Sequence, residues 1–178
     1  MKTLYAALFG IIALVVCVPP AAADFERAFP SWDKQINKPS RFKVLSQFGN
    51  AAVFDKETGL VWEQSPSTSA FTWVNALSHC YQLEVGGRKG WRLPTIEEQA
   101  SLVDASNISP ALPTGHPFTL TALQEEQFYW SATTLASNTS AAWFVNLFNG
   151  VVSIEDKGGN VNSVAWCVRG GQGIDGVQ

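Results

Sequence analysis

The stretch that decides the fold is Gly90-Trp91-Arg92-Leu93-Pro94-Thr95-Ile96-Glu97-Glu98-Gln99-Ala100-Ser101-Leu102-Val103-Asp104. Within it, Thr95 and Glu98 have the spacing of a capping box, in which each side chain accepts a hydrogen bond from the backbone N–H of the other residue. Pro94 keeps Leu93 out of the helical region, so the helix cannot begin earlier. The apolar residues that follow recur at the i, i+4, i+7 spacing of a helix with one buried face. The stretch therefore predicts a capped helix that begins at Thr95 and extends to about residue 104.

A second helix is predicted over residues 72–83, where Thr72 can serve as the N-cap. Its helical periodicity gives the segment one apolar face. That face is expected to consist of Trp73, Leu77, Cys80 and Tyr81.

Short apolar runs between turn residues predict strands over 52–54, 60–62, 129–133, 142–148 and 164–169. The first two form a hairpin, with Gly59 in the turn. Asn149-Gly150 is typical of a type I′ hairpin turn, which would set Leu147 opposite Val152 and Val145 opposite Ile154. The predicted elements are those of a small α+β domain.

Four ordered sequence blocks resemble those of the Lcl C-terminal domain family, named for the C-terminal domain of a bacterial collagen-like adhesin. The resemblance extends from about Phe42 to Gly171 and implies a C-type lectin-like fold, shared with formylglycine-generating enzymes. In that fold two helices pack on small antiparallel sheets with long loops. The blocks are Thr58-Gly59-Leu60-Val61-Trp62, the Gly-Trp-Arg-Leu-Pro-Thr-x-x-Glu run at 90–98, Tyr129-Trp130-Ser131-Ala132-Thr133-Thr134 and Cys167-Val168-Arg169-Gly170-Gly171.

The N-terminal residues have the pattern of a cleaved signal peptide. Lys2 precedes an apolar run over 4–18, and three alanines at 21–23 form a small-residue cleavage site. No second apolar run follows, so no membrane span is expected after cleavage, and the product is expected to be periplasmic or secreted. The predicted organisation is a signal peptide (1–23), an N-terminal arm (24–50), the Lcl C-terminal-like domain (51–171) and a flexible tail (172–178).

Cleavage after Ala23 removes Cys17 and leaves Cys80 and Cys167, which in an exported chain are most simply one disulfide. The resemblance agrees, because the C-type lectin-like fold has a long disulfide from its first helix to its last strand. The alternative is a pair of redox-active thiols in an enzyme of formylglycine-generating-enzyme-like fold. His79 adjoins Cys80, but neighbours on a helix point about 100° apart and form a poor nucleophile–base pair.

The sequence contains no catalytic motif for zinc proteases, serine hydrolases, phosphate-binding loops or paired-cysteine redox sites. Its two histidines, His79 and His116, lack metal-ligand spacing. The calcium-binding triplets of calcium-dependent lectins are also missing. No metal site and no cofactor are therefore predicted. The formal net charge of −3 argues against nucleic acid as a partner.

Recognition is the remaining class of function, and the lectin-like fold places its ligand-recognising loop within residues 105–140. The candidate ligand-binding residues of that loop are His116, Glu125, Glu126 and Asn138. Arg88 and Lys89 are an option for anion binding, since the family's adhesin is associated with sulphated polysaccharide; a solvated loop tip is the other interpretation.

Five tryptophans allow either sugar stacking or core packing. Their alternation with apolar residues in the predicted strands favours the core. These tryptophans are Trp62, Trp91, Trp130, Trp143 and Trp166.

Together these features predict an exported, non-enzymatic recognition domain. It would bind a carbohydrate, such as a sulphated polysaccharide, or a protein at the bacterial cell envelope. The alternatives are the redox-active enzyme and a purely structural envelope module.

Overall fold

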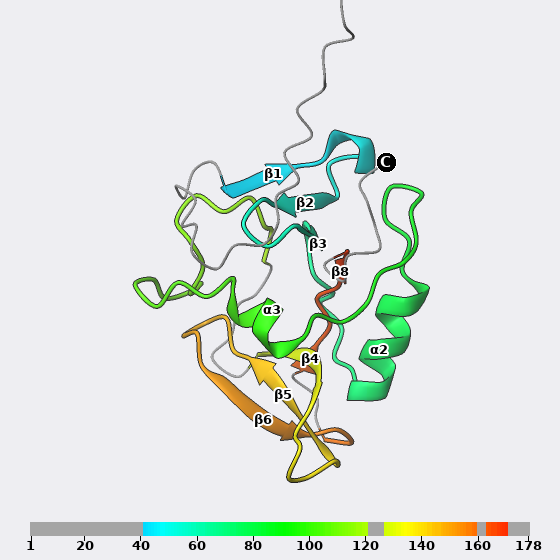
Figure 1. Cartoon of the computed structure of the whole chain (residues 1–178), viewed down its shortest axis with the longest axis vertical. Helices are drawn as coiled ribbons and strands as arrows, with labels where there is room; N and C mark the ends of the chain where they lie inside the picture. The colour runs from blue at the N-terminus through cyan, green and yellow to red at the C-terminus, as the bar shows by residue number, and fades with distance from the viewer. Residues whose placement is uncertain (1–40, 121–126, 160–162, 171–178) are drawn as a thin grey trace, which may run out of the picture.

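Two four-stranded sheets form the framework of the chain in the computed structural model, which describes residues 41–120, 127–159 and 163–170 (Figure 1). The first sheet has the order β1-β2-β3-β8 and the second the order β6-β5-β4-β7. The strands are β1 (Phe42–Val44), β2 (Ala52–Asp55), β3 (Leu60–Glu63), β4 (Phe128–Thr134), β5 (Ala141–Val145), β6 (Val152–Asp156), β7 (Ser163–Val164) and β8 (Val168–Arg169). The helices are η1 (Ser46–Phe48), α2 (Trp73–Gln82) and α3 (Ile96–Ala100). The predicted α+β class is confirmed.

Residues 163–169 join the two sheets, and we call them the closing segment. The prediction of one strand over 164–169 is wrong, because β7 pairs with β4 in the second sheet while β8 pairs with β3 in the first. The β4–β7 pairing is parallel, so the sheets are not purely antiparallel as expected. The three residues between β7 and β8, Ala165, Trp166 and Cys167, are completely buried where the chain passes from one sheet to the other.

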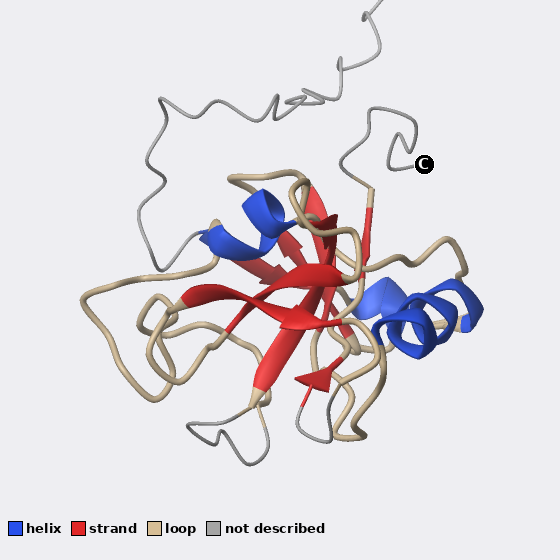
Figure 2. Cartoon of the chain, turned by 90° about the horizontal axis from the view of Figure 1, so that it is seen from below, coloured by secondary structure: helices blue, strands red, loops and turns tan. Residues whose placement is uncertain are grey.

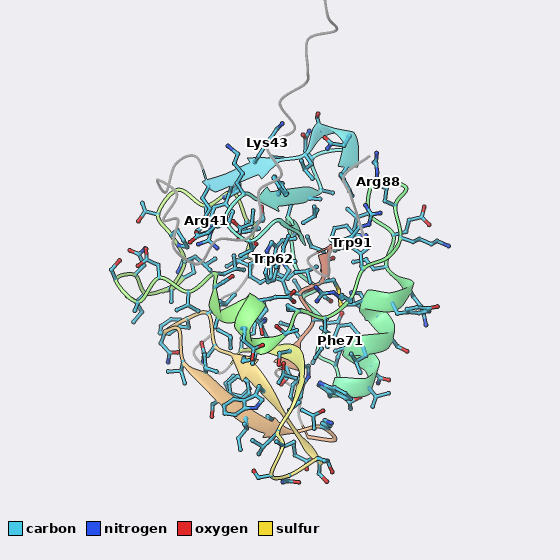
Figure 3. All side chains as sticks on the ribbon, in the orientation of Figure 1. Arg41, Lys43, Trp62, Phe71, Arg88 and Trp91 are labelled. Atoms are coloured by element: carbon cyan, nitrogen blue, oxygen red, sulfur yellow. A yellow bond between two sulfur atoms is a disulfide. The ribbon has the colours of Figure 1, made fainter. Side chains whose placement is uncertain are left out.

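Aromatic side chains fill the interior. Four of the five tryptophans singled out above are essentially inaccessible to solvent: Trp62, Trp91, Trp130 and Trp166. The Trp62 and Trp166 rings lie 5.1 Å apart, which bridges β3 and the closing segment. Figure 3 shows Trp62 and Trp91 in the middle of the molecule. Core packing, rather than sugar stacking, is therefore the role of these four; Trp143 is partly buried.

The predicted capping box of α3 is confirmed. The Thr95 hydroxyl accepts from the Glu98 N–H at 3.3 Å, and Glu98 Oε2 accepts from the Thr95 N–H at 2.8 Å. The helix nevertheless ends at Ala100, because the next turn tightens to i→i+3 bonds from the N–H groups of Leu102 and Val103. The predicted extent to residue 104 is too long.

Arg92 connects this cap to the first sheet. Its guanidinium donates to both oxygens of Glu98 at 2.7 Å and to the Gly170 carbonyl at 2.8 Å. Its backbone N–H and C=O pair with Val168 in β8. The Gly90–Glu98 stretch thus holds α3 and β8 together.

The predicted helix over 72–83 is confirmed as α2, with Thr72 accepting from the Asn75 N–H. In Figure 2 the strands occupy the middle of the molecule and α2 lies at its right-hand side. Trp73, Leu77 and Cys80 pack against the core, but Tyr81 is 81% exposed. The buried stripe is narrower than expected, because Tyr81 lies a further 100° around the helix from Cys80.

The hairpin of β2 and β3 is confirmed, with Gly59 at φ +74° in its turn. The register predicted for β5 and β6 is wrong: Val145 lies opposite Val152, and Trp143 opposite Ile154. A type I′ turn needs positive φ at both central residues, and only Gly150 has it. The Asn146 carboxamide oxygen instead accepts from the Phe148 N–H. The paired part of β5 therefore ends two residues before the predicted position, with Val145 instead of Leu147 opposite Val152.

Residues 41–50, the described part of the expected N-terminal arm, belong to the packed domain. Arg41 is 7% exposed and donates to both carboxylate oxygens of the completely buried Asp55, at 2.9 and 2.8 Å. β1 then extends the first sheet beyond β2. The predicted signal peptide and tail, and residues 24–40 of the arm, lie outside the described residues. Over the described ranges, the structure contains no helix long and apolar enough to cross a membrane.

Replacing Glu98 should destabilise the fold more than replacing its neighbour. Glu98→Ala removes the returning bond of the capping box and leaves the Arg92 guanidinium without its carboxylate. We expect the free energy of unfolding to fall by about 2 kcal/mol, combining one cap and one partly buried ion pair. Glu97→Ala is the matched control, because Glu97 lies in the same helical turn but is exposed. Equal losses in urea denaturation would contradict the role assigned to Glu98.

Candidate functional site

The predicted disulfide is confirmed and lies at the centre of the fold. Cys80 of α2 and Cys167 of the closing segment are bonded across 87 positions of sequence, with Cα atoms 5.5 Å apart. Neither residue is accessible to solvent. Because both sulfurs are buried, a thiol of another protein cannot reach this disulfide. Burial therefore argues against the alternative in which Cys80 and Cys167 are redox-active thiols.

A buried carboxyl group adjoins this disulfide. Glu63, at the end of β3, is only 6% exposed, and its Oε2 accepts from the Cys167 N–H at 2.8 Å. Burial raises the pKa of Glu63 from its ordinary 4.5 to about 7, against a smaller opposing effect of the hydrogen bond from Cys167. Glu63 is not among the site residues predicted from the sequence. Its signal was a carboxylate following the three apolar residues of β3, all of which are buried.

His79 completes a cluster around the disulfide. One ligand-type atom of each of Glu63, His79 and Cys167 lies within 4.8 Å of the others. The His79 ring packs on Phe71 with centroids 4.8 Å apart, and partial burial lowers its pKa. Although His79 and Cys80 point in different directions from α2, the His79 ring lies close to Cys167, the residue to which Cys80 is bonded.

The two predicted loop residues that the structure describes, His116 and Asn138, each make local contacts. The His116 ring stacks on Phe118, and its Nδ1 accepts from the Phe118 N–H at 3.2 Å; Phe118 packs in turn on Phe42 of β1. The turn between β4 and β5 lies at the foot of Figure 1. Asn138 belongs to this turn, and its Oδ1 accepts from the Ser140 N–H. Glu125 and Glu126 lie outside the described residues. His116 and Asn138 thus each bond within their own loop, and the shared ligand site stays a prediction.

Of the predicted anion-binding pair, Arg88 and Lys89, Arg88 is engaged in contacts within the domain. Arg88 donates to the Gln47 carbonyl at 2.6 Å and lies over the Phe48 ring, 4.5 Å from its centroid. Figure 3 shows Arg88 at the edge of the molecule. Lys89 is 75% exposed, and its nearest carboxylate, that of Glu84, is 3.8 Å away. Arg88 therefore anchors its loop to η1, and Lys89 alone extends into solvent.

An exposed apolar surface was not predicted. Four of the seven large apolar side chains exposed by the described residues lie on β6, in the β5–β6 turn and in the loop beside that turn. The loop is joined to the hairpin by bonds from the Ser109 N–H to the Phe148 carbonyl and from the Ala111 N–H to the Leu147 carbonyl. We call the four side chains the hairpin patch; they are Ile108 (68% exposed), Val151 (49%), Val152 (41%) and Ile154 (42%).

The family model of the Lcl C-terminal domain matches residues 51–169. The chain belongs to this family. No significant match to a curated protein was found. Both features described above fall within the matched range: the Lcl C-terminal domain of this chain contains the Glu63–His79–disulfide cluster as well as the hairpin patch, whereas β1 precedes it.

The buried carboxyl group should make the stability of this Lcl C-terminal domain depend on pH. The pKa of Glu63 is higher in the folded protein than in the unfolded chain, so the folded state binds more protons between about pH 4.5 and 7. The contribution of Glu63 is thus fully present below pH 4.5 and lost as the pH rises through 7. We expect Glu63→Gln to raise the free energy of unfolding above pH 7, by up to roughly 3 kcal/mol, and to change it little near pH 4.5.

Urea denaturation of the disulfide-bonded protein across this pH range measures the effect. Glu97→Gln is the control, since it removes an exposed carboxylate. His79 titrates in the opposite sense and is present in both proteins, so the difference between wild type and Glu63→Gln isolates Glu63. Parallel pH profiles for these two proteins would contradict the raised pKa.

Proposed function

We propose that this Lcl C-terminal domain is an exported, non-enzymatic recognition module of C-type lectin-like fold that binds an extended, apolar segment of another bacterial envelope protein. The hairpin patch is the single observation that carries the proposal. Val152 and Ile154 lie two positions apart on the edge strand β6 and so share one face, while Val151 and Ile108 lie in the adjoining turn and loop. Exposed apolar side chains gathered in one region are typical of a surface that a partner covers. The export proposal rests on the signal-peptide pattern of residues 1–23.

The backbone at this edge favours an extended partner. Among the described strands, β6 has a neighbour on one side only, β5. Residues 151 and 157 bond to the residues that flank β5: the Asn146 N–H donates to the Val151 carbonyl, and the Lys157 N–H donates to the Ser140 carbonyl. Because bonding alternates along an antiparallel pair, the backbone groups of Val152 and Ile154 are directed outward. They can pair with an added strand while the patch takes up its apolar side chains.

The chemistry of the patch favours a protein over a glycan. Sugar sites use exposed aromatic rings, but the patch is aliphatic. A sulphated polysaccharide needs clustered cations. Lys157, the basic residue that follows β6, donates to Thr134 Oγ1 at 2.7 Å and packs on Trp73, while Glu155 and Asp156 precede it. The partner strand is therefore expected to combine β-branched residues with a basic residue opposite these carboxylates.

Three features support the lectin-like fold within the proposal. A disulfide joins α2 to the closing segment, two small sheets frame the core, and no strand interrupts the described residues between α3 and residue 120. A purely structural module would have no need of the exposed patch.

Removing two patch side chains should weaken partner binding without unfolding the domain. A photo-crosslinking residue placed at 154 would capture the partner in intact envelopes of the native host, and a strand peptide of that partner would then be titrated against purified protein. We expect Val152→Ser with Ile154→Ser to weaken binding at least tenfold, equivalent to about 1.4 kcal/mol.

The matched control is Val74→Ser with Tyr81→Ser, which removes two exposed apolar side chains from α2. Equal loss in the control would contradict the assignment to the hairpin patch. Specific binding on a glycan array, without a protein crosslinked at 154, would replace the protein partner with a carbohydrate.

A further inference from the structure

The cluster around the disulfide offers ligands for a metal ion once the disulfide is opened. It draws Glu63 from β3, His79 and Cys80 from α2, and Cys167 from the closing segment. The atoms of Glu63, His79 and Cys167 lie within 4.8 Å of one another, and Cys80 Sγ is bonded to Cys167 Sγ. Four side chains of the types that bind zinc thus converge from three segments far apart in sequence.

The spacing suits a tetrahedral site. Zinc–sulfur bonds of about 2.3 Å and zinc–nitrogen or zinc–oxygen bonds of about 2.0–2.2 Å put the ligand atoms of such a site roughly 3.3–3.8 Å apart. The atoms of Glu63, His79 and Cys167 lie within 4.8 Å of one another, so they need to approach by no more than about 1 Å to reach that spacing. The two sulfurs must separate, which reduction allows.

We propose that the reduced domain binds one Zn²⁺ through Cys80, Cys167, His79 and Glu63. The metal then joins the same three segments that the disulfide joins in the oxidised domain. The two states exclude each other, because a sulfur held in the disulfide is not a thiolate ligand.

The conversion balances with a phosphine as the two-electron reductant. The phosphine is oxidised to its oxide with oxygen from water, the sulfur–sulfur bond breaks, and the two protons of that water go to the sulfurs. Zn²⁺ then displaces both thiol protons, and the proton of Glu63 where that group is protonated, to the buffer. It binds the two thiolates, with the neutral His79 ring and the Glu63 carboxylate as the remaining ligands.

The surroundings already hold two of these ligands in place. The Cys167 N–H donates to Glu63 Oε2, which fixes the carboxylate beside the sulfur. The His79 ring packs on Phe71, which restricts its orientation; Figure 3 shows Phe71 beside α2. His79 is also only partly buried, so its side of the cluster is the route by which the metal would enter. Such supporting contacts are typical of metal sites.

Cobalt is the spectroscopic probe for this site. Protein reduced with a phosphine and titrated with Co²⁺ should bind one equivalent and show thiolate-to-cobalt charge transfer together with the visible bands of tetrahedral Co²⁺. Zn²⁺ should displace it. Co²⁺ titration of the disulfide-bonded protein should give neither feature.

Variants of the proposed ligands distinguish a four-residue metal site from metal binding by the two cysteine thiols alone. We expect His79→Ala and Glu63→Gln each to weaken binding to the reduced protein at least tenfold, and Cys80→Ser with Cys167→Ser to remove the charge-transfer band. His116→Ala is the matched control, since His116 is the chain's other histidine and is also partly buried. Unchanged affinity in both His79→Ala and Glu63→Gln would overturn the proposal.

Circular dichroism covers the case in which the reduced, metal-free protein unfolds. Recovery of the folded spectrum on adding one equivalent of Zn²⁺ would then support the site. An unfolded reduced protein that neither binds Co²⁺ with a thiolate band nor refolds with Zn²⁺ would overturn it.

Discussion

The structure depends on how the closing segment is held against β3 and α2. Glu63 and Cys167 are joined through backbone and side chain, since the Glu63 N–H donates to the Cys167 carbonyl and the Glu63 carboxylate accepts from the Cys167 N–H. The disulfide adds α2 to the same point. Trp166 donates from its indole to the Glu63 carbonyl, so one of the four buried tryptophans is oriented by this contact. Both sheets and the first long helix therefore meet around a few residues.

Local signals in the sequence were sufficient for the elements that they control directly. The cap of α3 depends on Thr95 and Glu98, three residues apart, and the cap of α2 on Thr72; both were predictable because their partners lie within one turn. The disulfide was also predictable, since only two cysteines follow the expected cleavage site. The hairpin of β2 and β3 followed from a strong turn signal.

Interactions between distant segments were harder to predict. Nothing near residue 164 in the sequence indicates that the chain leaves one sheet and enters another, because that depends on the positions of β3 and β4. The ion pair of Arg41 with Asp55 drew part of the expected arm into the first sheet. At the β5–β6 turn, local hydrogen bonding by asparagine side chains outweighed the preference of Asn-Gly for a two-residue turn. The cluster at the disulfide could not be predicted either, because Glu63 and His79 are distant from Cys167 in the sequence and approach it only in the folded chain.

The closing segment also has a consequence for the kinetics of folding. Its β8 pairs with β3, and its β7 pairs with β4, so contacts that complete the first sheet span more than a hundred positions of chain. Bringing such distant residues together has a large entropic cost before any apolar area is buried, which slows the search for the native state. Ala165 and Cys167 belong to one core cluster and Trp166 to the other, so neither core is complete without the closing segment. A chain whose core depends on such long-range contacts is more exposed to aggregation while it folds.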